Sequence, residues 1–306
     1  MMEKLRGVPK RILNFHKKSA QQKFESYGYR WFRWFPGVPA PVRLETGIWW
    51  LMDKDFIGES LLKDNYEGAE ASFLASFVKP GMMVLDIGAH RGFHTLRLSQ
   101  SVGRNGRVVA IEPSPRDAQR LRLHLKINFC RNVEVVECAI GEQDGKADLY
   151  TVPTNSVLNS LRPPDTELGS SPIEVRLRKL DSVLSETKIG SVDFVKLDVE
   201  GGELYVLRGA GNLLERVPRP IILCEILEQR TRPWGYSAEL IASHLLTKKF
   251  RWFELTATGR LTPVRDDVEL CGNFVAVPEE SLTLVHELRA SDGACWKQPP
   301  ADCLSE

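Results

Sequence analysis

Short apolar runs alternate with amphipathic segments along most of the chain from Lys79 onward. Apolar runs that stop at a glycine or an acidic residue are typical of buried strands, and they predict strands at 82–87, 106–112, 133–139, 192–198 and 220–227. Apolar positions at helical spacing predict helices at 93–101, after Ser114-Pro115, at 203–208 and at about 237–248. Repeated strand–helix units of this length predict an α/β fold, with a doubly wound, mostly parallel sheet and helices on both faces.

Two further patterns refine this expectation. The last two predicted strands, 251–256 and 272–277, have a connection too short for a helical crossover, so we expect antiparallel neighbours. Strands at 147–152 and 173–177 flank a loop of Pro, Ser and Asn, within an insert at 147–179. We therefore expect a Rossmann-like sheet of seven strands with an antiparallel last strand. The expected regions are an N-terminal extension (1–64), the α/β domain (65–288) and a flexible tail (289–306).

The charge is unevenly distributed along a globular composition of 42% apolar and 26% charged residues. The formal net charge is +1, but residues 1–35 hold nine Lys and Arg against two Glu, so they carry +7 and the rest −6. Seven aromatics also lie in this arm: Phe24, Tyr27, Tyr29, Trp31, Phe32, Trp34 and Phe35. A membrane-surface contact, an RNA contact, a sugar-stacking platform, self-association and packing onto the body are all compatible with such an arm.

Three features bear on the location of the protein. No apolar run approaches the ~18 residues of a membrane-spanning helix, and no apolar segment of a secretory signal follows the basic N-terminus. The six cysteines (130, 138, 224, 271, 295 and 303) form no C-x-x-C pair and show no metal-ligand spacing, which favours reduced thiols. We expect a cytoplasmic protein, with a peripheral membrane contact through residues 1–35 left open.

The first strand–helix turn carries the chemistry of a cofactor site. Asp86 is followed by glycines at 88 and 92, and Glu112 ends the second strand. A dinucleotide favours G-x-G-x-x-G, whose bare backbone N–H groups receive a pyrophosphate. Here the spacing is G-x-x-x-G, and the carboxylate of Asp86 would repel a pyrophosphate. The same carboxylate suits a ligand with an ammonium group, such as S-adenosylmethionine, and Glu112 can accept the hydroxyls of its ribose.

Four segments together resemble the FkbM-type S-adenosylmethionine-dependent methyltransferases. They are D-I-G-A-H-R-G-F-H-T (86–95), V-V-A-I-E-P (108–113), C-A-I-G-E-Q-D-G (138–145) and V-K-L-D-V-E-G-G-E (195–203). The resemblance covers about 65–277, and it implies a Rossmann-like enzyme of a family that often O-methylates sugars or natural-product hydroxyls. The sequence departs from the family pattern at His90-Arg91, where Asn and an apolar residue are common. It also departs at Gly202, where a larger residue is usual and its absence predicts a wider site.

The resemblance assigns the cofactor-binding residues. Asp86, Gly88, Ala89 and Gly92 would hold the methionine end of S-adenosylmethionine, and Glu112 its ribose. Ala139 and Ile140 would pack on the adenine, with a plain core contact as the alternative. Asn128 resembles a family position at the end of the second helix, which a helix C-cap explains equally well.

Catalysis is expected after the fourth long strand. Alternation in an extended segment would put Asp198 and Glu200 on one side, with Glu203 entering the next helix. Glu225 ends the following strand at the same edge of the sheet and can join them, and His94 is a second candidate base. An alcohol is a poor nucleophile while protonated, so a base or a metal should assist. Asp198, Glu200 and Glu225 can form an all-oxygen magnesium-type site, but no spacing demands a metal.

These observations predict an S-adenosylmethionine-dependent O-methyltransferase that acts on a hydroxyl of a sugar, glycoconjugate or natural product. The insert, with Asn159-Ser160-Leu161-Arg162, is placed to cover this acceptor. Three alternatives stay open: a nicotinamide-dependent oxidoreductase, a nucleic-acid methyltransferase that uses the basic arm, and a non-catalytic cofactor-binding protein. The −6 body disfavours nucleic acid, because it offers no broad basic track.

Overall fold

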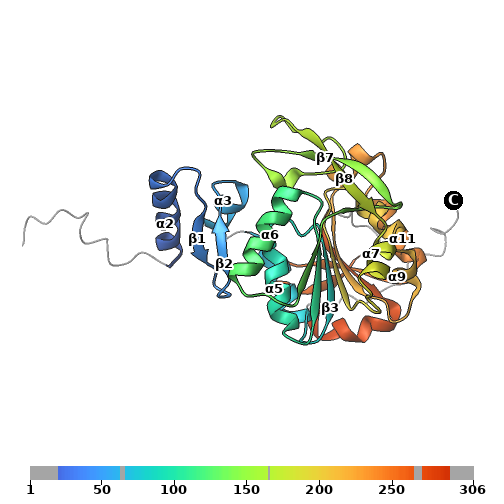
Figure 1. Cartoon of the computed structure of the whole chain (residues 1–306). Helices are drawn as coiled ribbons and strands as arrows, with labels where there is room; N and C mark the ends of the chain where they lie inside the picture. Colours follow the sequence, from blue (N-terminus) through green and yellow to red (C-terminus); the bar gives the residue numbers. More distant parts are fainter. Residues whose placement is uncertain (1–19, 63–65, 165, 265–270, 290–306) are drawn as a thin grey trace, which may run out of the picture. The chain divides into compact units, whose positions relative to one another are not determined.

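The computed structural model describes residues 20–62, 66–164, 166–264 and 271–289. Its contacts divide the chain into two compact units, Met1–Glu67 and Gly68–Glu306, which we describe separately (Figure 1). The predicted tail at 289–306 lies outside the described residues except for Arg289, as do residues 1–19 of the basic arm and Cys295 and Cys303. No helix in the described ranges is both long and apolar enough to cross a bilayer.

The N-terminal unit is built on a β-hairpin. Its elements are α2 (Ala20–Trp34), β1 (Ala40–Arg43), β2 (Trp49–Met52) and α3 (Phe56–Leu62). The hairpin is antiparallel, and alternate residues on one of its faces are buried, among them Val42, Trp50 and Met52. Gly28 of α2 lies so close to Leu62 and Met52 that a Cβ there would stand 2.8 Å from Leu62 Cδ2. This contact defines the inner face of α2.

The second unit contains a central sheet at its core. Within the described residues the sheet has eight strands, in the spatial order β12 (Leu261–Pro263), β11 (Phe250–Leu255), β13 (Gly272–Pro278), β10 (Ile221–Ile226), β9 (Phe194–Leu197), β3 (Met83–Ile87), β4 (Arg107–Ile111) and β5 (Val133–Val136). The pairs from β10 to β5 are parallel, and β13 is antiparallel to both β10 and β11. The strand order reverses between β3 and β9, which is where ligands bind in doubly wound sheets.

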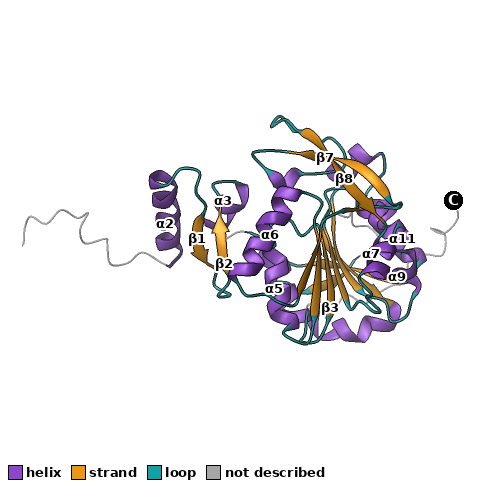
Figure 2. Ribbon diagram, in the orientation of Figure 1, coloured by secondary structure: helices purple, strands orange, loops and turns teal. Residues whose placement is uncertain are grey.

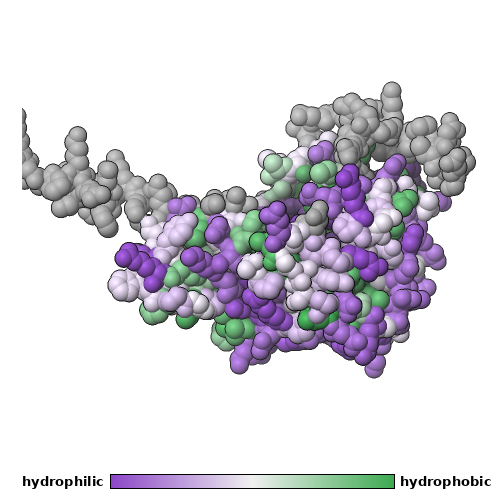
Figure 3. Space-filling view, turned by 90° about the horizontal axis from the view of Figure 1, so that it is seen from above, coloured by the Kyte–Doolittle hydropathy of each residue, from purple (hydrophilic) through white to green (hydrophobic). Residues whose placement is uncertain are grey.

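Helices cover both faces of this sheet, with α5 and α6 on one side and α7, α9 and α11 on the other (Figure 2). The helices are α4 (Gly68–Phe77), α5 (Phe93–Val102), α6 (Pro115–Ile127), α7 (Leu180–Glu186), α8 (Glu203–Arg208), α9 (Gly211–Glu215), α10 (Glu228–Thr231) and α11 (Glu239–Thr247), and the 3₁₀ segments are η2 (Ser156–Leu158), η3 (Arg232–Trp234) and η4 (Glu279–Leu288). Two large clusters of buried apolar side chains form the core. On the face shown in Figure 3, hydrophobic residues occur as small separate areas among hydrophilic ones.

The insert forms a second, three-stranded sheet. Its strands are β6 (Ala139–Ile140), β7 (Gly145–Thr151) and β8 (Ser171–Arg178). β8 lies between the other two, parallel to β6 and antiparallel to β7. In Figure 1 the β7–β8 pair lies beyond one end of the central sheet. The loop between β7 and β8 returns to β7, since Tyr150 and Ser160 exchange two backbone hydrogen bonds.

The structure confirms the predicted α/β class, the mostly parallel doubly wound sheet and the antiparallel last pair. The Ser114 N-cap is also confirmed, because its hydroxyl accepts the N–H of Asp117. The strand count of seven is wrong, since the three-residue β12 extends the edge. The third predicted strand, 133–139, is also wrong at its end: it splits, and β6 joins the second sheet. Neither β6 nor β12 is long enough to show a period along the chain.

Candidate functional site

The predicted cofactor turn lies against the predicted catalytic loop. Gly88 follows β3 with a φ of +83°, and a Cβ there would stand 1.7 Å from the carbonyl oxygen of Asp198. Gly92 has a φ of +91°, and a Cβ there would stand 2.3 Å from Leu121 of α6. Only glycine permits both the left-handed backbone and this closeness. The two glycines therefore bring the turn into contact with the end of β9 and with α6.

Asp86 has a buried carboxylate with one oxygen in need of a donor. Its side chain is 1% exposed, and Oδ2 accepts a 2.6 Å hydrogen bond from the hydroxyl of Thr95. Oδ1 is buried and has no hydrogen-bond partner among the described residues. A buried carboxylate oxygen without a donor is costly. This position therefore fits a cationic or hydrogen-bond-donating ligand group, and Thr95, which sequence reasoning missed, orients the carboxylate.

Glu112 follows β4 and faces the same turn. Its Oε2 accepts the backbone N–H of His90 at 2.7 Å and its Oε1 that of Ser114 at 2.8 Å. Burial, with a smaller contribution from Asp117, raises the pKa of Glu112 to about 8. A carboxyl group, protonated or ionised, has more hydrogen-bonding positions than two backbone donors use, so Glu112 keeps room for further hydroxyl groups. Its assignment to a ribose stays a prediction, as do those of Gly88, Ala89 and Gly92 to the methionine end.

His90 and Arg91, the departure from the family pattern, form a buried polar network. Arg91 is 5% exposed and its Nε donates to Oδ1 of Asp117, which is 1% exposed, at 3.1 Å. His90 adopts a left-handed φ of +48°, and its Nε2 lies 3.6 Å from the same oxygen. Burial alone would raise the pKa of Asp117, but His90, Ser114 and Arg91 together hold it below its ordinary value.

The same network reaches the insert. The hydroxyl of Ser156 lies 2.8 Å from His90 Nε2 and accepts a 2.9 Å hydrogen bond from Arg91 Nη2. The amide of Asn159 donates to Asp117 Oδ2 at 3.2 Å. His90 and Arg91 therefore hold the loop between β7 and β8 against the first turn. This accounts for the polar pair at 90–91, which the sequence did not explain.

Ala139 and Ile140 form β6 and are both buried. Ala139 packs with Leu149 and Val175 of the second sheet, and Ile140 belongs to the larger core cluster. Their contact with an adenine stays a prediction. Asn128 is the C-cap of α6, and its side-chain amide donates to the carbonyl of His124, which supports the alternative that the sequence left open.

The three predicted carboxylates Asp198, Glu200 and Glu225 do meet. One oxygen of each lies within 4.8 Å of the others. The reason given by the sequence is wrong, however, because the segment is not extended: β9 ends at Leu197, and Glu200 has a left-handed φ of +55°. This conformation costs free energy for a residue other than glycine, so it persists only where surrounding contacts enforce it, often at functional sites.

Two cationic side chains already compensate this cluster. Lys196 is a buried ammonium group within β9, and its Nζ donates to Asp198 Oδ2 at 2.8 Å. Arg230 Nε lies 2.9 Å from Glu200 Oε2, an ion pair whose N–H is not aligned for a hydrogen bond. Burial and then Asp198 raise the pKa of Glu200 well above its ordinary value, and Arg230 partly opposes this shift. A lysine in an otherwise apolar four-residue strand was the sequence signal for a buried partner.

Glu203 begins α8, as predicted, but it stabilises the loop before that helix. Its Oε1 accepts the backbone N–H groups of Val199 at 3.0 Å and Gly201 at 3.2 Å. Burial raises its pKa to about 7. This carboxylate therefore holds the conformation that presents Glu200.

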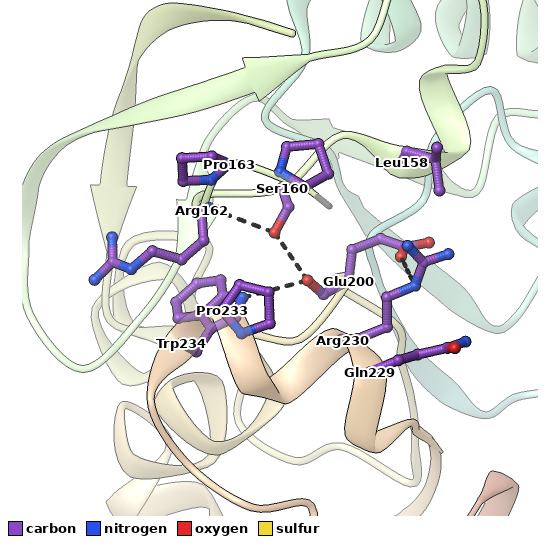
Figure 4. A pocket seen from close by; sticks show the side chains of 10 residues that line it. Leu158, Ser160, Arg162, Pro163, Glu200, Gln229, Arg230, Pro233 and Trp234 are labelled. Atoms are coloured by element: carbon purple, nitrogen blue, oxygen red, sulfur yellow. Dashed lines mark hydrogen bonds and ion pairs between the residues drawn. The ribbon is translucent and has the colours of Figure 1, made fainter. Parts of the chain in front are cut away.

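A cavity of about 280 Å³ lies beside Glu200 (Figure 4). The loop between β7 and β8 and the α10–η3 segment form its walls; the lining residues are Leu158, Ser160, Arg162, Pro163, Pro164, Glu200, Gln229, Arg230, Pro233 and Trp234. Ser160 Oγ donates to the carbonyl oxygen of Glu200 at 2.8 Å, and Trp234 Nε1 donates to the same oxygen at 3.4 Å. The insert therefore lines a pocket at the acidic cluster.

The expectation that Gly202 widens the site is wrong. A Cβ at Gly202 would stand 2.9 Å from the indole of Trp234, so the ring of Trp234 fills the space that a larger residue would take. A Cβ at Gly201 would stand still closer to a neighbour, at 2.1 Å from the carbonyl oxygen of Arg230. The two glycines thus let α10 and η3 pack onto the loop after β9, where catalysis is predicted. Trp234 and Arg230 are the site residues that the sequence did not reveal, because they lie some thirty positions further along the chain.

His94 is not a member of this carboxylate group. It is buried in the first turn of α5 with its ring edge-on to Phe93, and it is not part of the carboxylate cluster found among the described residues. Its role as a base stays a prediction without geometric support.

A family model, the methyltransferase FkbM domain, matches residues 86–251, which contain the glycine turn, the insert and the carboxylate cluster. The chain belongs to the FkbM methyltransferase family. Its sequence is 29% identical over 153 residues to the 2-O-methyltransferase NoeI of Sinorhizobium fredii, covering 45% of this chain and 61% of that protein. It is 24% identical over 143 residues to methyltransferase 1 of Beauveria bassiana, covering 41% of this chain and 57% of that protein. The FkbM chain thus spans about 60% of the length of these relatives.

The fold of the chain is also similar to solved structures. The FkbM chain resembles an O-methyltransferase from Bacillus cereus in complex with S-adenosylhomocysteine, with 14% identity, 87% of this chain and 92% of that chain covered, and a TM-score of 0.41. It also resembles fibrillarin from Aeropyrum pernix with natively bound S-adenosyl-L-methionine, with 15% identity, 68% and 73% covered, and a TM-score of 0.40.

Proposed function

We propose that this FkbM-family chain transfers a methyl group from S-adenosylmethionine to a hydroxyl of an acceptor held in the pocket beside Glu200. The acceptor class we propose is a sugar, a glycoconjugate or a hydroxylated natural product. The observation that carries the proposal is a single one: Glu200 lines a cavity at the loop after β9, and the carbonyl of Asp198 in the same loop packs against Gly88 of the turn after Asp86, at the strand-order reversal of the sheet.

Two carboxylates support S-adenosylmethionine as the cofactor. The orphan oxygen of Asp86 suits the ammonium group of the methionine end, and it would repel the pyrophosphate of a nicotinamide cofactor. Glu112 keeps acceptor positions for the ribose hydroxyls beside its two backbone donors. Gly88 and Gly92 fix the turn between these carboxylates. The residues present therefore fit this cofactor.

The pocket supports a small hydroxylated acceptor. Its volume of about 280 Å³ is close to the lower end of small-molecule sites, which run from ~300 to ~1,000 Å³. Trp234 and the prolines offer apolar faces, and Ser160 and Gln229 offer hydrogen-bonding groups. A sugar unit presents the same combination of C–H faces and hydroxyls. The similarity to a protein named 2-O-methyltransferase agrees with oxygen as the methylated atom.

Glu200 is the residue that we assign to proton transfer. When bound, the cofactor supplies an electrophilic methyl group on a sulfonium. Asp86 and Glu112 would hold this cofactor, its methyl group would go to the acceptor oxygen with S-adenosylhomocysteine as the leaving product, and Glu200 would take the hydroxyl proton. A carboxylate with a raised pKa is a stronger base near neutral pH than an ordinary glutamate. Arg230 orients it, and Asp198 maintains its basicity through charge.

A divalent cation at Asp198, Glu200 and Glu225 is not needed in this proposal. Lys196 and Arg230 already place positive charge against two of the three carboxylates. The metal thus stays an open prediction with a direct test.

The first experiment separates cofactor from chemistry. Calorimetric titration with S-adenosylhomocysteine and with NAD should give binding of the former alone. An acceptor screen with methyl-labelled S-adenosylmethionine, across glycans, small alcohols and RNA, should label a hydroxylated small molecule or glycan. Glu200→Gln should then lose most of the turnover and retain S-adenosylhomocysteine binding. The matched control is Glu215→Gln, at an exposed carboxylate on α9, and it should behave as the wild type. Normal turnover in Glu200→Gln would refute the assignment of the base.

A further inference from the structure

The exposed aromatic side chains are concentrated in the N-terminal unit. Tyr29, Trp34, Phe35, Trp49 and Phe56 are 58%, 73%, 51%, 47% and 55% exposed. In the described part of the second unit, Phe129 is the single aromatic that is exposed to a similar degree. Large exposed aromatics in one small unit are typical of a surface that contacts a partner.

The geometry of α2 separates an inner from an outer face. Gly28 contacts Leu62 and Met52, and this marks the inner face. At about 100° per residue, Arg30 and Arg33 fall on the opposite side of the helix, and Tyr29 and Trp34 flank them. All four side chains are exposed. The outer face therefore has a cationic centre with an aromatic ring on each side.

No carboxylate in the described part of the unit neutralises the charge of this face. Arg30 Nε donates to the backbone carbonyl of Ser26, and neither Arg30 nor Arg33 forms an ion pair with a described carboxylate. The hairpin also places an arginine beside an aromatic ring, since Arg43 is the cross-strand neighbour of Trp49 and both are exposed. Guanidinium groups bind phosphate oxygens in a bidentate manner, and Trp and Tyr favour the boundary between water and hydrocarbon.

We propose that the outer face of α2 docks this protein onto an anionic phospholipid surface. Residues 1–35 carry +7 by sequence, which attracts an anionic surface, whereas the remaining residues carry −6. A lipid surface accounts for the exposed Phe and Trp side chains, which would lose contact with water there. A nucleic acid is disfavoured as the occupant, because the residues after the arm carry −6 and offer no broad basic track for a phosphate backbone.

The test is flotation of the full chain with vesicles. Vesicles of phosphatidylcholine with about one third phosphatidylserine should carry the protein upward at low salt, and pure phosphatidylcholine should carry little. Each Lys or Arg near such a surface contributes about fivefold in partitioning, so Arg30→Gln with Arg33→Gln should reduce it about 25-fold. Trp34→Ser should reduce it several-fold with an unchanged melting temperature.

Matched controls lie in the second unit. Arg104→Gln with Arg131→Gln removes the same charge at two exposed positions, and Phe129→Ser removes an aromatic that is 83% exposed; neither should change vesicle binding. Equal losses in the controls, or equal binding to neutral vesicles, would overturn the proposal. An absence of vesicle binding would also overturn the proposal. The same holds for a result in which the α2 variants lose RNA binding or self-association and not vesicle binding.

Discussion

Removal of Arg91 is the sharpest perturbation of the network that holds the insert to the first turn. We consider Arg91→Met, which keeps most of the side-chain volume and deletes the charge. It leaves the carboxylate of Asp117, 1% exposed, without its 3.1 Å partner, and the hydroxyl of Ser156 without its 2.9 Å donor. Removal of one partner from a buried ion pair costs about 3–5 kcal/mol of unfolding free energy.

An exposed ion pair provides the comparison. Lys146 and Glu174 pair across β7 and β8 with side chains 70% and 62% exposed, so Lys146→Met should cost less than about 1 kcal/mol. Both variants are measured by urea unfolding of the full chain at pH 7, followed by circular dichroism. Adding Asp117→Asn to Arg91→Met should recover part of the loss, because it neutralises the carboxylate that is left behind.

The pH dependence gives this prediction a second readout. In the wild type the pKa of Asp117 is held below its ordinary value of 3.8. Its ionised form therefore stabilises the fold above that value, and the stabilisation is lost as the pH falls through the lowered pKa. The difference between wild type and Arg91→Met should be complete near pH 7 and shrink below about pH 4. Equal losses for Arg91→Met and Lys146→Met at pH 7 would refute the reasoning.

Three other predictions concern the site. Glu112 has a pKa of about 8 in the folded protein, above its ordinary 4.5, so the native state holds its proton between these values. The free energy of unfolding should therefore fall as the pH rises from 4.5 to 8, by up to ~1.4 kcal/mol per pH unit. Urea unfolding at pH 5.5 and 8 should show that Glu112→Gln lacks this contribution, and an equal pH dependence in the variant and the wild type would contradict the burial argument. Trp234→Ala should raise the KM for the acceptor about tenfold at unchanged S-adenosylhomocysteine affinity, the size expected for one aromatic contact; an unchanged KM would place the acceptor elsewhere. Turnover should survive extensive dialysis against a chelator, since Lys196 and Arg230 already compensate the carboxylates; loss of turnover that magnesium restores would instead assign the cluster to a cation.

Most of the sheet could be predicted from the sequence, because long buried strands and amphipathic helices carry their own periodicity. The meeting of Asp198, Glu200 and Glu225 was also predictable, since the carboxyl ends of neighbouring parallel strands share an edge. The conformation at Glu200 was not, because the left-handed backbone depends on contacts from Ser160 and Trp234, which are distant in sequence.

The partners of the charged residues were the least predictable part of the site. Arg91 meets Asp117 through the packing of the first turn against α6, and Glu200 meets Arg230 through the packing of α10 against the sheet edge. The Gly202 expectation failed for the same reason: a missing side chain shows that space is available, and the tertiary structure decides that Trp234 fills it. Lys196 was the exception, because a charge inside a buried strand requires a partner nearby.

The most direct test of the central claim is the identity of the reaction product. The wild-type chain is incubated with S-adenosylmethionine carrying a ¹³C-labelled methyl group and with the acceptor found in the screen, and the product is examined by NMR spectroscopy. We expect a labelled methyl group on an oxygen, coupled to the carbon that carried the hydroxyl, with one S-adenosylhomocysteine formed per product and loss of both in Glu200→Gln. A labelled methyl group on nitrogen or carbon, or full product formation in Glu200→Gln, would contradict this expectation.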